Sequence, residues 1–292
     1  MAGLKEIRTR IASVVSTSQI TSAMKMVSAA KLRRAQEAIQ QIRPYSNKLH
    51  ELLSDISASI DATEDNVFAQ VREPKKILYV AITSNRGLCG AFNTNIVKRC
   101  LMMAERDFPE QLANGRVEFA AIGKKAADLF KSRKVKVVQQ YGQVFEKLSF
   151  ENVVTVADQL MDNFTEKIYD RIFLVYNQFK NAGVQIVTEE QFLPIEVAND
   201  GEHHFNRDYL IEPSKEYVVE VLIPKSLKIM VYKALLDSVA SEHGARMTAM
   251  HKATDNARQL LKDLRINYNK ARQASITNEI LEIVGGANAL KK

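Results

Sequence analysis

Residues that could support catalysis are few and scattered along the chain. It contains two cysteines, Cys89 and Cys100, and five histidines. A cysteine nucleophile needs an assembled histidine partner, and neither cysteine belongs to the CxxC pairs that indicate a zinc site or a disulfide framework. His203 and His204 lie in a polar stretch, where exposure is more common than metal ligation. The sequence therefore predicts no catalytic residue, no metal site and no cofactor.

A short glycine-containing segment is the nearest approach to a phosphate-binding loop. Residues 86–90 read RGLCG and come between an apolar run and a helical pattern. The chain contains neither GxxxxGK[ST] nor GxGxxG, the loops that cradle phosphates. The helix that follows could hold an anion at its N-terminus, but a tight turn is the preferred interpretation of such a segment.

The distribution of charge is the first informative feature. The net charge of the 292 residues is +7. Residues 1–50 hold nine basic and two acidic side chains, and residues 225–292 hold twelve and six, whereas the segment between them is net acidic. Within the first segment Lys31, Arg33 and Arg34 form a nearly single-signed run. Two distant segments with one bias predict that the ends lie together and face a common acidic partner.

Two long helices are predicted to carry these basic ends. Apolar residues recur at steps of three and four from Leu4 to Val27 and from Ile42 to Ile56, with Ile20 among them. A second stripe includes Met250, Ala253, Ala257, Leu260, Leu264, Asn267 and Ala271. This narrow periodicity is typical of a coiled-coil seam, and rods on the order of 80 to 100 Å follow from 1.5 Å per residue. We expect the two helices to pack antiparallel, with Pro44 as a possible kink.

The middle of the chain alternates between strand and helix patterns. Apolar runs at residues 76–83, 117–123, 135–138 and 171–177 read as strands, and residues 184–193 as an edge hairpin strand. Helical patterns at 91–106, 124–132 and 151–168 separate them. This alternation predicts a mostly parallel sheet that is covered on both faces. We therefore divide the chain into an N-terminal coiled-coil helix at 1–60, an α/β domain at 75–195, a connection with short strand pieces at 196–224 and a C-terminal coiled-coil helix at 225–292.

The C-terminal end is apolar on most sides. Ile276, Ile280, Ile283 and Val284 belong to this tip, and an exposed surface of this kind predicts a collar supplied by other chains. No apolar run approaches the roughly 20 residues that span a bilayer, and the N-terminus does not read as a signal peptide. We expect a cytoplasmic setting with membrane association only through partners.

Several long motifs resemble one family. They are residues 1–8 (MAGLKEIR), 20–32 (ITSAMKMVSAAKL), 86–90 (RGLCG), 245–250 (ARMTAM), 253–257 (ATDNA) and 268–280 (YNKARQASITNEI). Together they closely resemble the gamma subunit of the bacterial F-type rotary ATP synthase, over the full length of the chain. The resemblance implies a Rossmann-like α/β domain inserted between two terminal helices that form a long antiparallel, left-handed coiled coil.

The same resemblance implies a function and its partners. The expected role is the central-stalk rotor of a proton-translocating synthase, which couples rotation of the membrane c ring to the catalytic cycle of an alpha/beta hexamer. ATP chemistry would belong to the beta subunits, so the chain itself would not be an enzyme. The epsilon subunit is a further expected partner, nucleic acid is not, and the expected location is peripheral, at the cytoplasmic face of the bacterial inner membrane.

Individual contact residues follow from matching positions in the family. Tyr209 and Glu212 match the foot that meets the c ring, and Asn85 departs from an aspartate that is common before the RGLCG segment. The positions that match contacts with beta subunits of the hexamer are Met24, Lys31, Arg33, Arg34, Arg246, Gln273 and Thr277. The alternative that the residues leave open is a basic coiled-coil protein that binds nucleic acid, although no aromatic side chain for base stacking precedes Tyr45.

Overall fold

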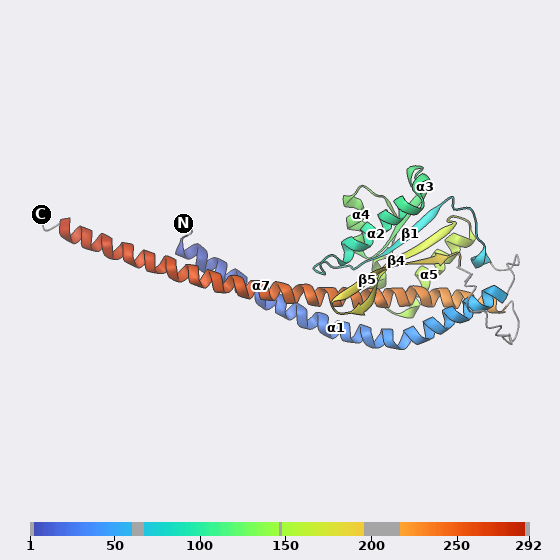
Figure 1. Ribbon diagram of the computed structural model, residues 1–292, viewed down its shortest axis with the longest axis horizontal. Helices are drawn as coiled ribbons and strands as arrows, with labels where there is room; N and C mark the ends of the chain where they lie inside the picture. The colour runs from blue at the N-terminus through green and yellow to red at the C-terminus, as the bar shows by residue number, and fades with distance from the viewer. Residues whose placement is uncertain (1–2, 60–66, 146–147, 196–216, 290–292) are drawn as a thin grey trace. The chain divides into compact units, whose positions relative to one another are not determined.

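In a computed structural model, residues 3–59, 67–145, 148–195 and 217–289 are described. The chain divides into two compact units, one made of residues 1–28 with 246–292 and the other of residues 29–245. Two long helices, α1 (Leu4–Ser59) and α7 (Ile223–Ala289), each contribute to both units (Figure 1).

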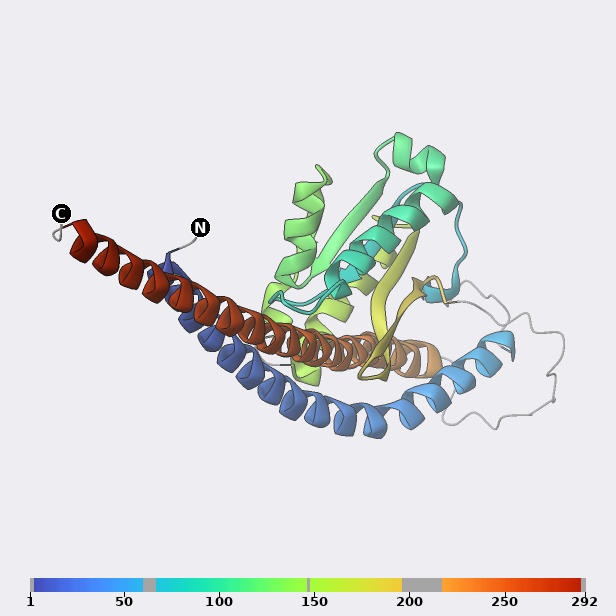
Figure 2. The same cartoon turned by 60° about the vertical axis from the view of Figure 1, so that its left-hand side comes forward.

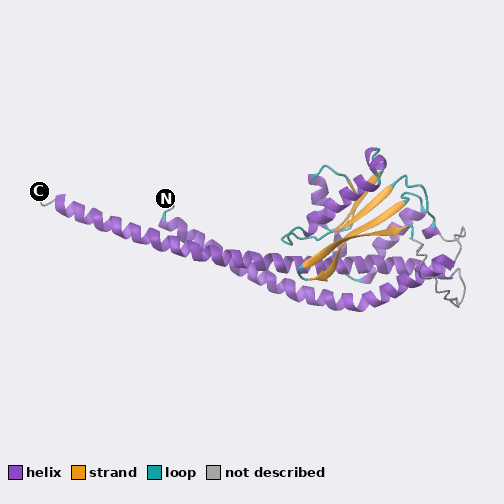
Figure 3. Cartoon of the chain, viewed as in Figure 1, coloured by secondary structure: helices purple, strands orange, loops and turns teal. Residues whose placement is uncertain are grey.

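The larger unit contains a five-stranded mixed sheet (Figure 3). Its strand order is β3-β2-β1-β4-β5. The first four strands in this order run parallel, and β5 pairs antiparallel with β4 as the expected hairpin. The strands are β1 (Ile77–Ile82), β2 (Val117–Ile122), β3 (Val137–Gln140), β4 (Arg171–Asn181) and β5 (Val184–Leu193).

Helices cover both faces of the sheet (Figure 2). Alternate residues of β1 enter different cores, because successive side chains of a strand point to opposite faces: Leu78 and Val80 pack with α5 (Phe150–Thr165) and the first part of α7, and Tyr79 packs with α2 (Phe92–Asp107) and α4 (Lys124–Ser132). Shorter elements complete the unit: α3 (Pro109–Ala113), η1 (Val67–Ala69), η2 (Gly142–Phe145) and η3 (Val218–Leu222).

The fold class predicted from the sequence is confirmed, with differences at element ends. β3 begins two residues later than predicted, and β4 continues to Asn181. The expected strand pieces before residue 225 are wrong for residues 218–222, which form a π-helix that leads into α7. Pro224 is the second residue of α7. A proline is tolerated in the first turn of an α-helix, where a backbone N–H has no carbonyl partner within the helix, so Pro224 is compatible with helix here. Residues 196–216 lie outside the described part of the chain.

In the smaller unit the two long helices run antiparallel. The hydroxyls of Thr21 and Thr254 are 2.8 Å apart, and Arg8 donates a hydrogen bond of 3.4 Å to the Tyr268 hydroxyl. As residue numbers fall along α1 they therefore rise along α7. Buried positions of α7 include Met250, Ala257 and Leu264, a seven-residue spacing that favours a left-handed coiled coil.

The seam in this unit follows most of the predicted stripe but departs from it at two positions on each helix. Ile20 and Val27 are 56% and 57% exposed, whereas the small polar residues that follow them, Thr21 and Ser28, are buried. On α7, Leu260 and Asn267 are exposed, and the residues that follow them are half-buried. Hydropathy alone favoured the aliphatic positions, but small side chains allow closer helix packing, and hydrogen bonds satisfy the buried hydroxyl of Thr21.

Candidate subunit-contact surfaces

The basic run on α1 is an exposed helical surface. Lys31, Arg33 and Arg34 are exposed, while Leu32 and Ala35 beside them are 5% and 8% exposed. Burial at spacings of three and four leaves the residues between them on the outer face. Arg33 pairs with Glu37 at 3.2 Å, and both side chains are well exposed. Because exposed pairs of this kind are weak, the positive charge stays accessible to an acidic partner.

The predicted contact residues of the smaller unit are not equivalent. Met24 is half-buried one turn beyond Thr21, at the border of the seam. Gln273 and Thr277 are exposed and lie one turn apart on one face of α7. The Thr277 hydroxyl donates to the backbone carbonyl of Gln273 at 2.9 Å. The amide of Gln273 is therefore the more available of these two groups for a partner.

Arg246 differs from the other predicted contact residues. It is only 7% exposed and already interacts with other groups of the chain. This burial was not predicted from the sequence, because basic residues are usually exposed. Its contact with a partner remains a prediction.

The end of α7 is an exposed apolar tip. Every residue from 276 to 287 is exposed. The large apolar side chains among them are Ile276, Ile280, Leu281, Ile283 and Val284, with exposed fractions from 45% to 71%. The predicted apolar end of α7 is confirmed. Exposed apolar side chains that cluster in this way are typical of a contact with another chain.

The RGLCG segment forms a tight turn that is stabilised by hydrogen bonds among the polar groups in and beside it. Leu88 and Gly90 have φ values of 63° and 62°. The backbone N–H of Ser84 donates to Asn93 Oδ1 at 2.9 Å, and the Asn93 amide donates to Cys89 Sγ at 3.2 Å. Cys89 is 2% exposed. The preferred interpretation as a turn agrees with this geometry, which offers no exposed nucleophile.

Asn85 joins this turn to two neighbouring elements. Its Oδ1 accepts a hydrogen bond of 2.9 Å from the backbone N–H of Lys124, and its Nδ2 donates to the carbonyl of Gly142 at 3.1 Å. An amide can fill both roles because it carries a donor and an acceptor. Asparagine at this position can therefore make both hydrogen bonds, whereas an ionised aspartate could make only the one with Lys124.

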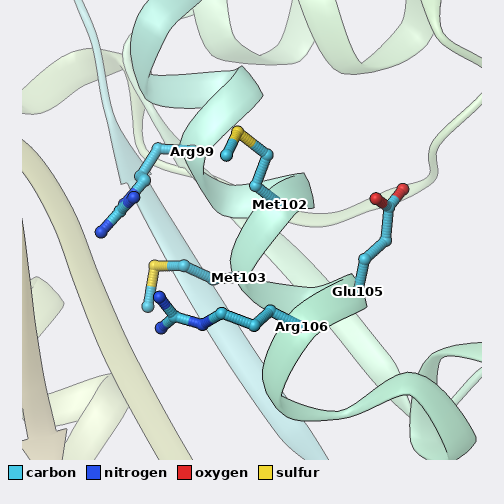
Figure 4. Close-up of a pocket in the computed structure, with 5 residues that line it drawn as sticks. All are labelled: Arg99, Met102, Met103, Glu105 and Arg106. Atoms are coloured by element: carbon cyan, nitrogen blue, oxygen red, sulfur yellow. The ribbon is translucent and has the colours of Figure 1, made fainter.

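A pocket of about 320 Å³ is lined by residues of α2. Figure 4 shows its lining residues Arg99, Met102, Met103, Glu105 and Arg106. The guanidiniums are committed to neighbouring carboxylates: Arg99 pairs with Glu189 at 2.8 Å and Arg106 with Asp107 at 2.6 Å. The hydrogen bond from Arg106 lowers the pKa of Asp107. In both ion pairs the carboxylate neutralises the guanidinium. The lowered pKa of Asp107 is the opposite of the shift that would suit a carboxyl for acid–base catalysis at neutral pH.

A second hollow, of about 590 Å³, lies beside η2 and α5. Amide side chains dominate its lining, with Gln140, Gln143, Asn152 and Gln159 among them. Burial raises the pKa of Tyr141 in this lining to about 12, so its phenol is neutral at physiological pH. None of the described residues that line the hollow is charged.

Two further absences apply to the described residues alone. No group of three or more His, Cys, Asp or Glu side chains in residues 3–59, 67–145, 148–195 and 217–289 could hold a metal ion. Across the same ranges, no helix is long and apolar enough to cross a membrane. Tyr209 and Glu212, the predicted c-ring contacts, lie outside the described residues.

One charged pair with a buried carboxylate was not predicted from the sequence. In the larger unit Arg43 of α1 meets Asp237 of α7 at 2.6 Å, and the carboxylate is fully buried. The available signal was an acidic residue inside the apolar stretch ALLDSVA at residues 234–240, because an aspartate is rarely buried without a partner.

Comparisons with known proteins agree with this geometry. The family described as ATP synthase matches residues 3–290. The chain is 58% identical to the ATP synthase gamma chain of Flavobacterium psychrophilum, with all of both chains covered, and 56% identical to that of Christiangramia forsetii, with 99% of each covered.

Solved structures agree on the fold. A chain of the Euglena gracilis mitochondrial ATP synthase superposes with a TM-score of 0.68 at 23% identity, over 98% of this chain and 94% of that one. A chain from the central stalk and c ring of the Tetrahymena thermophila mitochondrial enzyme gives 0.59 at 26% identity, over 80% and 99%.

Proposed function

Because the chain belongs to the ATP synthase gamma chain family, we propose that this central-stalk subunit is the rotor that couples turning of the membrane c ring to the catalytic cycle of the alpha/beta hexamer. Proton flow through the membrane sector turns the ring and the stalk with it. The observation that carries this proposal is the exposed apolar tip at the end of an antiparallel helix pair, a surface that needs a collar of other chains.

The chain acts without catalytic chemistry of its own. Its thiols are buried, and the two arginines of its α2 pocket are paired with Glu189 and Asp107. ATP is made or hydrolysed in the beta subunits, and the stalk changes their state by contact.

The contacts with the hexamer use two kinds of surface. Lys31, Arg33 and Arg34 face acidic surfaces of the beta subunits, near Met24. A rotor must not lock in one orientation, and weak exposed ion pairs suit that requirement. Arg246, Gln273 and Thr277 supply polar contacts to the hexamer.

A separate set of contacts connects the subunit to the membrane sector. Tyr209 and Glu212 meet the c ring, and the epsilon subunit binds the sheet-bearing unit. The chain is thus held peripherally at the cytoplasmic face of the bacterial inner membrane through its partners. The alternative of nucleic-acid binding has no support from the relatives, which are ATP synthase chains.

Affinity capture from detergent-solubilised membranes tests the proposal. A Lys131→Cys variant offers one exposed attachment point on α4, because the two native cysteines are buried. Biotin on this thiol should recover alpha, beta, epsilon and c subunits together with ATPase activity. A stably folded chain that recovers none of them would contradict the rotor role.

Substitution of Gln273 by alanine then tests a site assignment. The variant should lower turnover of the assembled complex and leave the isolated chain folded, since Gln273 is exposed. Normal turnover would remove Gln273 from the contact surface without affecting the rotor role.

A further inference from the structure

Three elements of the larger unit meet at the side chain of Arg43. Its Nη2 donates to Asp237 Oδ1 on α7 at 2.6 Å and to the backbone carbonyl of Phe179 on β4 at 2.8 Å. The backbone N–H of Phe179 donates to the same Oδ1 at 3.4 Å. We call Arg43, Asp237 and Phe179 the clasp. It joins α1, α7 and the end of β4 through one guanidinium and one carboxylate.

The clasp sits where β4 extends beyond its parallel neighbour. Pairing between β1 and β4 ends at Ala81 and Val175, whereas β4 continues to Asn181. Phe179 therefore has a strand partner, Gln185, on the β5 side alone. Buried backbone groups need hydrogen-bond partners, and on the open side the N–H and carbonyl of Phe179 find theirs in Asp237 and Arg43.

The carboxylate of the clasp depends on its cationic partner. The side chain of Asp237 is fully buried, whereas that of Arg43 is 36% exposed. Within the described residues, Oδ2 of Asp237 is buried without a hydrogen-bond partner. Lys233 is a further positive neighbour of Asp237, but it pairs with Glu190 at 3.6 Å. Loss of Arg43 would leave a buried charge without its direct counter-ion.

The two long helices are attached to the rest of this unit in different ways. α7 contributes Leu227, Val231 and Leu235 to the core of the sheet, and Lys228 pairs with Asp158 on α5 at 2.8 Å. At Gly244 an added Cβ would lie 3.2 Å from the carbonyl oxygen of Ala182 in the β4–β5 hairpin. Arg43 gives α1 a direct hydrogen bond to the strand that this hairpin extends.

We propose that Arg43 is a positioning residue for torque transfer, because the clasp makes α1, α7 and the end of β4 turn as one body. Apolar packing resists separation of two helices but is non-directional, so it opposes twist and sliding less well. Charge-assisted hydrogen bonds have a defined geometry and supply the directional part of the joint. This inference rests on the rotor role proposed above.

The first test compares proton pumping with ATP hydrolysis in reconstituted vesicles of the whole synthase. The variants are Arg43→Ala, Arg43→Lys and Asp237→Asn, with Gln41→Ala, an exposed neighbour on α1, as the matched control. Arg43→Ala should retain most of its hydrolysis and lose pumping per ATP several-fold. Arg43→Lys should recover part of the loss, because lysine keeps the charge but not the planar fork. Gln41→Ala should match the parent.

If the Arg43→Ala complex fails to assemble, Asp237→Asn provides a second variant in which pumping per ATP can be measured. The amide retains the shape of the side chain and removes the stranded charge, so the complex should form and pump less per ATP. If pumping and hydrolysis fall in parallel with the amount of complex, or if no clasp variant including Arg43→Lys assembles, the residues are structural and the proposal is wrong. Unchanged coupling in Arg43→Ala overturns it as well.

A second test measures the stiffness of the joint directly. A bead attached at Lys131→Cys reports angular fluctuations of the sheet-bearing unit in an immobilised alpha–beta–gamma complex. A looser joint should broaden the fluctuations of the stalled complex in Arg43→Ala and leave them unchanged in Gln41→Ala. Equal widths in the two variants contradict the proposal, whereas failure of the parent chain to join the complex contradicts the rotor role itself.

Discussion

The hydroxyl of Thr21 on α1 meets the hydroxyl of Thr254 on α7 at 2.8 Å in the seam of the antiparallel helix pair. Each hydroxyl also lies within hydrogen-bond distance of a backbone carbonyl of its own helix, Thr21 at 3.1 Å from that of Ser18 and Thr254 at 2.8 Å from that of Met250, so either hydroxyl can donate to the other. Both side chains are nearly fully buried. A polar contact thus occupies a seam position where the hydropathy pattern predicted an aliphatic one.

The first prediction concerns this hydroxyl pair. Thr21→Val should lower the free energy of unfolding by about 1 kcal/mol, the usual net worth of one hydrogen bond. Thr254→Val should do the same, but the double variant should cost less than the two together, because no hydroxyl is then left without its partner. Urea unfolding of the four proteins measures the coupling, and strict additivity would show that the hydroxyls do not interact.

Gly123 should tolerate no side chain. Its φ is 102°, and a Cβ there would overlap the carbonyl oxygen of Thr83. Gly123→Ala should therefore cost more than about 4 kcal/mol, which is exceptional for a point substitution. The matched control is Gly142→Ala, whose Cβ would make only ordinary contacts with the Lys124 side chain. Comparable unfolding midpoints of the two variants would contradict this reading.

Asn85→Asp tests the departure from the residue common in the family. A carboxylate could still accept from the N–H of Lys124, but it would face the carbonyl of Gly142 without a proton to donate. We expect a loss of about 1 kcal/mol, the usual net worth of one hydrogen bond, because Asn85 is only half-buried. Denaturant unfolding at neutral pH measures it, and the loss should shrink in acid, where the carboxyl is protonated. A neutral substitution would show that the amide donor is dispensable.

Asp237 should make stability depend on pH in a direction set by burial. Burial raises its pKa in the folded chain, against the lowering effects of Arg43 and Lys233. Between the unfolded value of about 4 and the raised folded value, the folded state binds more protons. Stability therefore falls as the pH rises through this window.

Comparison of the parent with Asp237→Asn isolates that contribution. The stability of the parent relative to the variant should decrease as the pH rises from about 4 towards neutrality. A relative stability that increases over this range would mean that the charge of Arg43 outweighs burial at this site.

The two native thiols should not react with thiol reagents in the folded chain. Cys89 and Cys100 are buried, and burial raises the pKa of the Cys100 thiol, which suppresses the reactive thiolate. A thiol reagent at pH 8 should label neither residue until denaturant is added, and then both. Lys131→Cys should add one fast-reacting group, and rapid labelling of the parent would contradict the burial.

The sequence by itself determined the periodic parts of this protein. The short run of β1 and the stepped apolar residues of α1 and α7 indicate secondary structure and fold class. A short β-branched apolar run bounded by turn residues favours a buried strand, and steps of three and four favour a helix. Long family motifs supplied the predicted contact residues, which stay predictions. The alternation of strand and helix also predicted correctly that the sheet is mostly parallel.

Tertiary structure decided the side chains whose state depends on distant neighbours. Ile20 is exposed and Thr21 buried because the partner helix, together with its Thr254 hydroxyl, selects the seam. Arg246 is buried although its residue type favours exposure. Arg43 and Asp237 are separated by 194 positions, and no local pattern encodes their contact. Periodicity reports which face of an element is apolar, whereas packing between elements decides which polar groups are buried together.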